Sequence, residues 1–385
     1  MNRRVSGAVG VWPPGKTSRI RADENVPRSA RVSEPTKPFR VGFIGAGGIS
    51  HMHMKHLKAI TGVELLAAAD VVEKSLEKVK ADFGIQRTYK DYKEMLKSEP
   101  DIDGVVVCTP NGLHAENSIA ALEAGKHVTV EKPMAMTAAE GQKMVDAAKR
   151  AGKHLITGFQ FRFDERTQLI RKHVEQGLFG KVMHVRCQAL RRRGIPNWGV
   201  FGRKDLQGGG PMIDIGVHVL EMAHFAMGAP RPVSASGNVW TFLGNKPSEV
   251  ASMWPNWDYK NYTVEDYAVG QIRFENGSLL SIEASFVAHI EKDLWNFQMM
   301  GEKGGADWET ASIFHDQNGY MFNSKPGWLP STGWDAVWPK KCQHFVSVCR
   351  GERPSISTGE DGLAVQKMLD GVYASAAAGR EVSIA

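Results

Sequence analysis

The sequence has little of what disulfide-bonded, membrane-spanning or metal-binding proteins require. Only four cysteines occur among 385 residues, and none shows Cys-x-x-Cys spacing, which predicts reduced thiols and a cytoplasmic location. No apolar run is long enough to cross a bilayer, so we expect no membrane contact. The His-Glu-x-x-His zinc pattern is absent as well, and we expect no metal.

The net positive charge of the chain comes from its first forty residues. The formal net charge is +6, and residues 1–40, with nine lysines and arginines against three acidic residues, account for all of it. The remainder is neutral overall and predicts no nucleic-acid partner. We expect residues 1–38 to form a basic, flexible extension. Arg3-Arg4 before a short apolar stretch leaves open an export leader, and a start codon placed too early is the other alternative.

Short β-branched runs alternate with helical segments between residues 39 and 160. Strands are expected at 41–44, 63–69, 105–108, 127–130 and 155–159, and helices at 49–60, 72–83, 91–97, 112–124 and 138–151. This alternation predicts an α/β fold with a parallel sheet covered on both faces. We therefore expect a Rossmann dinucleotide-binding domain over 39–160.

The pattern changes to period-two strands after residue 161. A helix to Glu175 is followed by strands at 182–190, 232–242, 267–274, 278–286 and 295–300, with further helices at 211–227 and 362–377. This predicts an α+β substrate-binding domain over 161–385 with an open, mostly antiparallel sheet. Between two of these strands, Asn276-Gly277 predicts a tight hairpin turn in which this pair supplies the positive φ angles.

A glycine-rich turn follows the first expected strand. In Gly45-Ala46-Gly47-Gly48-Ile49-Ser50, Gly45 permits a tight turn and Gly47 lets backbone amides approach a pyrophosphate at a helix N-terminus. Asp70, at the end of the second strand, is placed to accept hydrogen bonds from a ribose diol and to repel a 2′-phosphate, so NAD is favoured over NADP. The alternative is a plain strand-to-helix turn without a ligand.

Two further strand ends carry candidate groups. Thr109-Pro110-Asn111 and Glu131-Lys132-Pro133 each follow a strand, and ligands of open parallel sheets bind beyond the carboxyl ends of strands. Asn111 could instead be a simple helix N-cap. The proline holds Lys132 outside helical geometry, and a cis bond there is an alternative to the trans form.

An Asp/His pair interrupts an apolar helix. Asp214 and His218 are four residues apart on the segment that opens with Gly208-Gly209-Gly210, and they share a face. Polar side chains on an otherwise apolar helix need hydrogen-bond partners or a function. The alternative to a functional role is that Asp214 and His218 form a hydrogen-bonded pair within the core.

Several other side chains have less specific interpretations. One of Arg191–Arg193 is a candidate substrate contact, and the aromatic loop Trp254–Tyr259 could stack on a sugar or lie in an interface. His51, His53 and His56 are expected at the surface or at the cofactor edge, whereas His224 is expected to pack in the core.

Together these motifs resemble the Gfo/Idh/MocA family, named for glucose–fructose oxidoreductase and inositol dehydrogenase. The resemblance covers about Phe39 to Val382 and rests on the glycine turn, on Cys108–Asn111, on Glu123–Pro133 and on Gly209–His218. It implies that Lys132 is the catalytic lysine, His218 the proton-transfer histidine and Asp214 the substrate-orienting aspartate. It also implies an open sheet that often forms oligomer interfaces, hence a homodimer or tetramer.

The expected contacts follow from these motifs and the resemblance. Cofactor contacts are expected at Gly45, Gly47, Gly48, Ile49, Asp70, Thr109, Pro110, Asn111, His114, Glu131 and Lys132. Substrate contacts are expected at Lys132, Arg162, Trp198, Asp214 and His218.

The expected reaction is oxidation of a ring hydroxyl of a sugar or cyclic polyol to a ketone, or the reverse. His218 acts as the general base and Lys132 stabilises the developing alkoxide. The two could exchange roles, because desolvation beside a cationic nicotinamide makes a lysine easier to deprotonate. An NAD-binding sugar sensor without turnover and a redox-cycling glycosidase or lyase are the alternatives. The presence of both Lys132 and His218 favours an oxidoreductase.

Overall fold

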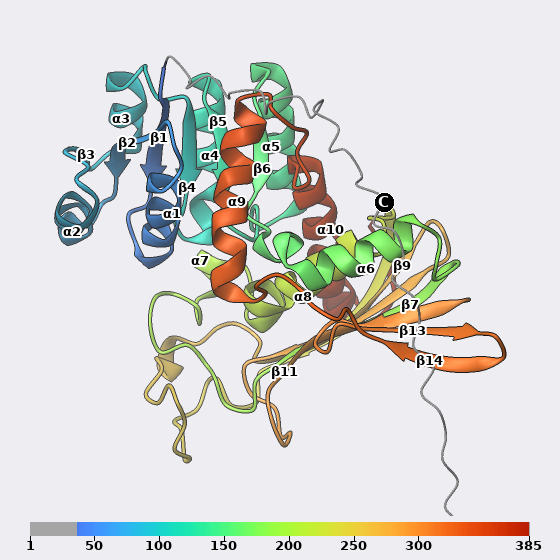
Figure 1. The fold of residues 1–385 in the computed structure, drawn as a ribbon. Helices are drawn as coiled ribbons and strands as arrows, with labels where there is room; N and C mark the ends of the chain where they lie inside the picture. The colour runs from blue at the N-terminus through green and yellow to red at the C-terminus, as the bar shows by residue number, and fades with distance from the viewer. Residues whose placement is uncertain (1–36, 385) are drawn as a thin grey trace, which may run out of the picture. The chain divides into compact units, whose positions relative to one another are not determined.

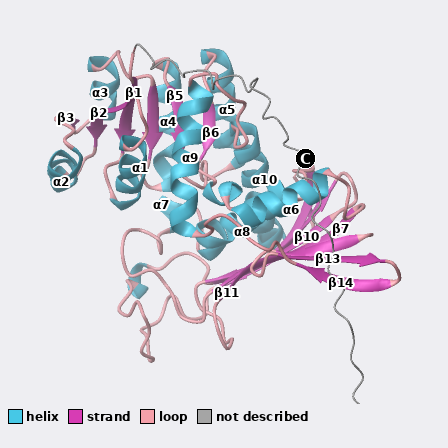
Figure 2. Cartoon of the chain, viewed as in Figure 1, coloured by secondary structure: helices cyan, strands magenta, loops and turns pink. Residues whose placement is uncertain are grey.

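The computed structural model describes residues 37–384. The expected basic extension, with its Arg3-Arg4 motif, lies outside the described residues apart from Lys37 and Pro38. Within the described range the strands form two sheets, which we call sheet A and sheet B (Figures 1 and 2).

Sheet A is parallel throughout, with the strand order β3-β2-β1-β4-β5-β6. Its strands are β1 (Phe39–Ile44), β2 (Val63–Ala69), β3 (Arg87–Tyr89), β4 (Gly104–Val107), β5 (His127–Val130) and β6 (Leu155–Thr157). They alternate with α1 (Gly48–Lys58), α2 (Glu73–Phe83), α3 (Tyr92–Ser98), α4 (His114–Glu123) and α5 (Ala138–Ala151). The predicted Rossmann arrangement is confirmed, and the short strand β3 is an addition. The strand order reverses between β1 and β4, where such sheets bind ligands.

Local sequence explains where the helices of this half begin and end. Helix α5 begins at a capping box in which Thr137 and Glu140 each bind the other's backbone. Helices α2 and α5 end at Gly84 and Gly152, which adopt left-handed φ angles of 80° and 61°. The strand β4 is Gly-Val-Val-Val and is wholly buried, as a central parallel strand should be.

Sheet B is mostly antiparallel, with the order β14-β13-β12-β11-β7-β10-β9-β8-β15 and one parallel pair, β7 with β10. Its strands are β7 (Val182–Leu190), β8 (Pro232–Trp240), β9 (Tyr267–Phe274), β10 (Leu279–Ser285), β11 (Leu294–Gly301), β12 (Gly304–Asp307), β13 (Ser312–Gln317), β14 (Tyr320–Ser324) and β15 (Val382–Ser383). The helices of this half are α6 (Glu165–Glu175), α7 (Lys204–Gln207), α8 (Val217–Ala226) and α10 (Gly359–Ala378). The expected open, mostly antiparallel sheet is confirmed, while β12–β15 were not foreseen.

Two local predictions need correction. Residues 211–227 do not form one α-helix: Met212–Gly216 is a π-helical turn that leads into α8. The β9–β10 hairpin exists, but only Gly277 has a positive φ, of 82°. The Gly277 amide donates to the Phe274 carbonyl, which makes a type I turn followed by a left-handed glycine rather than two left-handed residues.

Helix α9 (Trp334–Cys349) was not expected from the sequence, and it returns the chain to sheet A. Phe345 and Val346 of α9 share a core cluster with Phe39, Val41 and Phe43 of β1. Figure 1 shows α9 in orange alongside the parallel sheet. Residues expected to belong to the second domain therefore complete one face of the first sheet.

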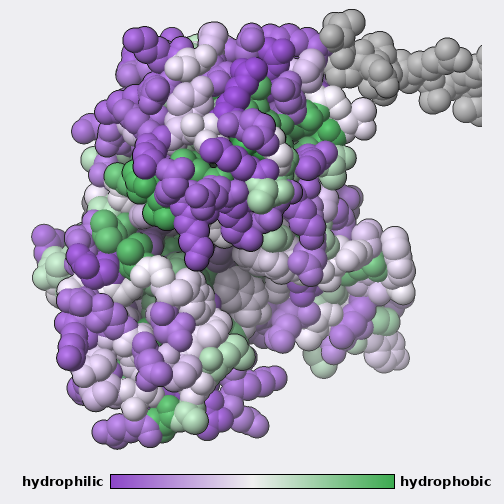
Figure 3. All heavy atoms as spheres, turned by 90° about the vertical axis from the view of Figure 1, so that its left-hand side faces the viewer, coloured by the Kyte–Doolittle hydropathy of each residue, from purple (hydrophilic) through white to green (hydrophobic). Residues whose placement is uncertain are grey.

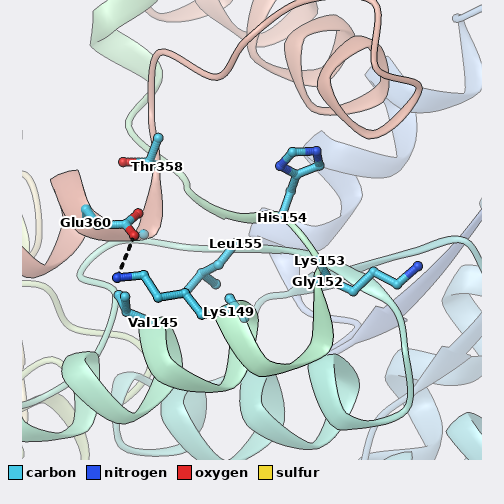
Figure 4. A pocket seen from close by; sticks show the side chains of 10 residues that line it. Val145, Lys149, Gly152, Lys153, His154, Leu155, Thr358 and Glu360 are labelled. Atoms are coloured by element: carbon cyan, nitrogen blue, oxygen red, sulfur yellow. Dashed lines mark ion pairs between the residues drawn. The ribbon is translucent and has the colours of Figure 1, made fainter.

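Helix α10 also contacts the first half of the chain, through α5. Its N-terminus is closed by a capping box between Thr358 and Asp361. Figure 4 shows a surface hollow at this junction, in which the Lys149 ammonium group lies 3.3 Å from the Glu360 carboxylate. This exposed ion pair contributes little to stability, so the packing of α10 on α5 must be stabilised mainly by buried contacts.

No helix of residues 37–384 is long and apolar enough to cross a membrane. The face drawn in Figure 3 is mostly hydrophilic, and hydrophobic side chains gather across its middle.

Candidate active site

Gly45 directly follows β1 and lies against the backbone of Cys108, which directly follows β4. Its φ is +91°, and a Cβ placed there would be 2.7 Å from the carbonyl carbon and oxygen of Cys108. Both constraints require glycine. The Gly45 amide donates to the Ala69 carbonyl at 2.9 Å, which fixes the turn to the end of β2.

Gly47 and Gly48 differ from Gly45 because no heavy atom lies within 4 Å of a Cβ built at either position. Gly47 is the N-cap of α1, and no side chain caps this helix start. An open helix N-terminus bordered by bare backbone fits the pyrophosphate of a dinucleotide. The next residues point inward: Ser50 is buried and Ile49 partly so.

Asp70 follows β2 and binds the glycine turn directly. Its Oδ2 accepts a hydrogen bond from the Ala46 amide at 2.7 Å, and its Oδ1 accepts one from the Val72 amide at 2.8 Å. Each carboxylate oxygen keeps a further lone pair that a ribose hydroxyl could use. Val71 next to it is 84% exposed and offers an apolar surface beside the same strand end.

The segment after β4 is held by His114 of α4. One ring nitrogen of His114 lies 2.8 Å from the Thr109 carbonyl oxygen and the other lies 2.8 Å from the Pro133 carbonyl oxygen. The ring is buried, so it positions two backbone turns and has no free nitrogen for a ligand. Burial lowers the pKa of His114, against the opposing effect of these two carbonyls.

Asn111 does not cap a helix, in contrast to the alternative considered from the sequence. Its side-chain amide donates to the carbonyl of Gln207 at 3.0 Å. Gln207 is the residue before the glycine-rich segment. Leu113 occupies the N-cap position of α4 instead. Asn111 thus connects the end of β4 to the segment that carries Asp214.

Glu131 and Lys132 follow β5 but make contacts with different elements. The Glu131 carboxylate is buried, binds His53 Nε2 at 2.7 Å and forms an ion pair with Lys341 of α9. Burial opposes its ionisation, yet Lys341 and His53 hold the pKa of Glu131 well below its usual range. The Lys132–Pro133 bond is cis.

His53 therefore needs correction, because it is not a surface or cofactor-edge residue. It is buried between Glu131 and Trp338, whose ring centroid lies 5.1 Å away. Burial and the nearby Lys341 lower the pKa of His53 to about 4, so it is neutral at physiological pH. The outcome for His224 agrees with expectation, since its ring is buried and stacks on Phe274 at 5.6 Å.

The three glycines before Asp214 permit very close packing. A Cβ at Gly209 would lie 2.2 Å from the Tyr373 hydroxyl, and one at Gly210 would lie 2.0 Å from the Glu265 carbonyl oxygen. The buried Glu265 carboxylate accepts hydrogen bonds from the amides of Gly210 and Met212 at 2.9 and 3.2 Å. The start of the π-helical turn is therefore fixed in position.

Lys132 meets Asp214 at this turn. The Lys132 ammonium group donates to the Asp214 carbonyl at 2.8 Å and to its carboxylate Oδ1 at 3.2 Å. Both side chains are partly exposed, so a ligand can reach them. The two residues are 82 positions apart in the chain, and the fold brings them into direct contact.

His218 lies one turn further on and faces the same pocket as Asp214. It is 5% exposed, and among residues 37–384 its Nδ1 has no hydrogen-bond partner. Burial, followed by the charge of Lys132, holds the pKa of His218 well below its usual range. A neutral imidazole at a pocket wall is suited to accept a proton.

The pocket has a volume of about 380 Å³ and is rich in aromatic side chains. Its lining comprises Phe161, Arg191, Pro196, Trp198, Phe201, Asp214, Ile215, His218, Trp295 and Trp334. The predicted Trp198 is present, and Arg191 is the member of the arginine run that lines it. Trp295 and Trp334 were missed.

Trp295 could have been found from the strand pattern. Period-two alternation places Trp295 on the same face of β11 as the buried Phe297 and Met299, and that face packs on α8, which carries His218. No comparable pattern in the sequence indicates Trp334, because α9, which carries it, was not predicted.

Arg162 also needs correction, since the structure places it in the core. It is 0% exposed, and its guanidinium group binds the Glu221 carboxylate at 2.9 Å and the Asp361 carboxylate at 3.0 Å. A fully enclosed guanidinium group has no surface with which to contact a substrate. Its role is to connect the segment after β6 to α8 and α10.

Among residues 37–384 no group of three or more histidine, cysteine, aspartate or glutamate side chains is arranged to hold a metal.

The parallel sheet, the open glycine turn and the acid after β2 define a Rossmann-fold dinucleotide-binding protein, and comparison with known proteins specifies the class. Residues 39–159 match the Gfo/Idh/MocA oxidoreductase family with its NAD-binding Rossmann fold, and residues 167–307 match the C-terminal domain of that family. The chain therefore belongs to the Gfo/Idh/MocA family and is an NAD-binding oxidoreductase.

Individual relatives match over most of their length. A D-glucoside 3-dehydrogenase of Escherichia coli (strain K12) is 34% identical over 91% of this chain and 98% of its own. A myo-inositol 2-dehydrogenase of Thermotoga maritima is 30% identical over 84% of this chain and 92% of its own. Among solved structures, a levoglucosan dehydrogenase in complex with NADH superimposes with a TM-score of 0.78 at 25% identity, covering 91% of this chain and all of that one.

Proposed function

We propose that the protein transfers a hydride between NAD and a ring hydroxyl or ketone of a sugar or cyclic polyol. The observation that carries this proposal is that Asp214 and His218 line an aromatic-rich pocket and that Lys132 contacts Asp214. The relatives named above, which act on glucosides, inositol and levoglucosan, support this substrate class.

NAD supplies the hydride acceptor, and the residues of the chain handle the proton. His218 takes the hydroxyl proton, and burial, by lowering its pKa, keeps the imidazole in the unprotonated form that can accept one at pH 7. Lys132 donates a hydrogen bond to the same oxygen and stabilises negative charge as it develops. Asp214 orients the Lys132 ammonium group through the 3.2 Å contact and can accept a bond from a neighbouring hydroxyl. Exchange of the two proton-transfer roles remains the alternative.

The proposed cofactor contacts divide into two groups. Gly45, Gly47, Gly48, Ile49 and Asp70 surround the turn at the start of α1, with Gly47 and Gly48 leaving backbone open to the pyrophosphate. Thr109, Pro110 and Asn111 line the end of β4, next to the segment that carries Lys132. We assign His114 and Glu131 a positioning role, because their polar atoms are already engaged by Thr109, Pro133, His53 and Lys341.

We further propose a homodimer or tetramer formed through sheet B, in the cytoplasm. The β13–β14 hairpin carries large exposed apolar side chains, Phe314, Tyr320, Met321 and Phe322, which supports an interface there. The four cysteines are unpaired, which supports a reducing compartment. Light scattering of the purified protein would measure the oligomer size directly.

The reaction is tested by following absorbance at 340 nm with NAD and NADP against a panel of sugars, inositols and sugar acids. Replacing His218 or Lys132 by alanine should lower kcat by about 10² to 10⁴ if His218 takes the proton and Lys132 stabilises the alkoxide as proposed. NAD binding should persist in the His218 variant and weaken at most in part in the Lys132 variant, because the glycine turn and Asp70 are intact in both. Reduction that survives in both variants would contradict the assignment. A wild-type protein that binds NAD yet reduces none of it would favour the sensor or the internally cycling enzyme.

A further inference from the structure

Two hollows meet at the loop of residues 196–203. The first is the candidate substrate pocket described above. The second, of about 70 Å³, is lined by that loop together with Trp257, Asp258, Asn261 and Tyr262. Pro196, Trp198 and Phe201 line both hollows, so the two adjoin along these side chains. A ligand that fills the first hollow can therefore extend past Trp198 into the second.

Trp198 is exposed yet held in place. Its side chain is 49% exposed, although its ring packs edge-on against Trp254 at 4.8 Å and lies 6.1 Å from Phe201. The Arg191 guanidinium group lies 5.0 Å from the centre of the Trp254 ring. A large aromatic surface fixed by its neighbours and left open to water is typical of a ligand-binding wall.

Polar side chains border the second hollow. The Asn197 amide donates to the Pro255 carbonyl at 2.7 Å and joins the two loops that form the hollow. The Asp258 carboxylate accepts bonds from the Asn261 backbone and side chain at 3.3 and 2.8 Å. Asn197 and Asp258 are both exposed and can exchange further hydrogen bonds with a ligand. An aromatic wall with hydrogen-bonding groups beside it matches a sugar ring, which has an apolar face and a polar rim.

We propose that residues 196–203 form a second subsite that receives a second sugar ring attached to the one being oxidised. The substrate class is then a disaccharide or similar glycoside rather than a free monosaccharide. This inference rests on the proposed function, because the first ring must lie beside His218 for the second to reach Trp198. The hydroxyl that is oxidised is still the one beside His218. The second subsite contributes only to the binding and orientation of the substrate.

The test compares one monosaccharide with disaccharides that contain it. NADH formation would be measured with glucose, maltose and cellobiose for the wild type and for Trp198→Ala. The wild type should show a higher kcat/KM for at least one disaccharide than for glucose. Trp198→Ala should lower that value by about tenfold while lowering the value for glucose several times less. Trp254→Ala, which removes the support behind Trp198, should shift the same ratio in the same direction.

Trp328→Ala provides the matched control, because Trp328 is 78% exposed and lines neither hollow. It should leave both kcat/KM values unchanged. Thermal unfolding of each variant would confirm that it is folded. NADH formed from glucose with no gain from either disaccharide would overturn the second subsite while leaving the proposed function intact. A disaccharide preference that both tryptophan variants retain would also overturn it. No NADH formation from glucose or either disaccharide would overturn the second subsite, and silence across the wider panel of sugars, inositols and sugar acids would contradict the proposed function as well.

Discussion

The ammonium group of Lys341 lies against the carboxylate of Glu131, the residue before Lys132, and both side chains are buried. The two residues are 210 positions apart, so α9 supplies a charge to the end of β5. Lys341 also lies 4.4 Å from the centre of the Trp338 ring. A buried charge that loses its partner is costly, which makes this pair sensitive to substitution from either side.

Replacing Lys341 by methionine should destabilise the protein by about 3–5 kcal/mol, because it leaves the Glu131 carboxylate buried without its cation. Chemical denaturation would measure the loss. The neighbouring Lys340 pairs with Glu165 at the surface, so Lys340→Met should cost less than about 1 kcal/mol. Adding Glu131→Gln to Lys341→Met should recover part of the stability. A double variant no better than the single one would show that the pair is not the cause.

Gly45 and Gly47 should respond differently to alanine. Gly45→Ala places a Cβ 2.7 Å from the Cys108 backbone at a φ of +91°, so it should destabilise the fold by more than about 1 kcal/mol. Gly47→Ala meets no atom within 4 Å, and its stability should stay within about 0.5 kcal/mol of the wild type. Its KM for NAD should nevertheless rise by about tenfold or more, because the methyl group occupies the path of the pyrophosphate. Unaltered NAD affinity in a folded Gly47→Ala protein would place the cofactor elsewhere.

Asp70→Asn should weaken the preference for NAD over NADP. The substitution removes the negative charge that would face a 2′-phosphate and keeps a side-chain oxygen for one backbone amide. We expect the ratio of kcat/KM for NAD to that for NADP to fall by about tenfold. Asp82→Asn removes an exposed charge on α2 that pairs with Lys78, and it should leave the ratio unchanged. Equal effects of the two changes would mean that general surface charge, not Asp70, selects the cofactor.

The pH dependence of kcat/KM for the sugar should reflect the environment of His218. Only the neutral imidazole can accept a proton, and burial with Lys132 nearby holds the pKa of His218 well below 6.5. Activity should therefore persist as the pH is lowered to about 6.5 and decline only below it. His218→Asn should abolish this acidic decline along with most of the rate. An acidic decline centred near neutrality in the wild type would indicate that His218 is charged more readily than its burial implies.

The sequence predicted those parts of the site that lie on strand ends and helix starts. Gly45, Asp70 and Lys132 occupy positions where the local pattern alone defines the backbone, because glycine turns, β-branched runs and capping residues act over a few residues. Sheet topology then brings these ends together, and the family resemblance placed Lys132 and Asp214 in one site, but their direct contact was not predicted.

The sequence-based predictions were wrong where residues distant in sequence bury a side chain and thereby decide its role. Arg162 resembles a substrate contact until its partners Glu221 and Asp361 are known, and both are distant in sequence. His53 resembles a surface residue of an amphipathic helix until α9 covers it. Helix α9 was itself missed, because Pro339 and its tryptophans obscure the helical pattern.

The return of α9 to β1 bears on how the chain folds as it is synthesised. Phe345 and Val346 fill the core beside Val41 and Phe43, so the nucleotide-binding half cannot close until α9 has left the ribosome. At ordinary elongation rates this corresponds to roughly ten to forty seconds during which apolar residues of the first sheet face the cytosol or a chaperone. Fragments that end after β6 should therefore aggregate rather than bind nucleotide, and transplanting this nucleotide-binding half into another protein would require α9 to be carried with it.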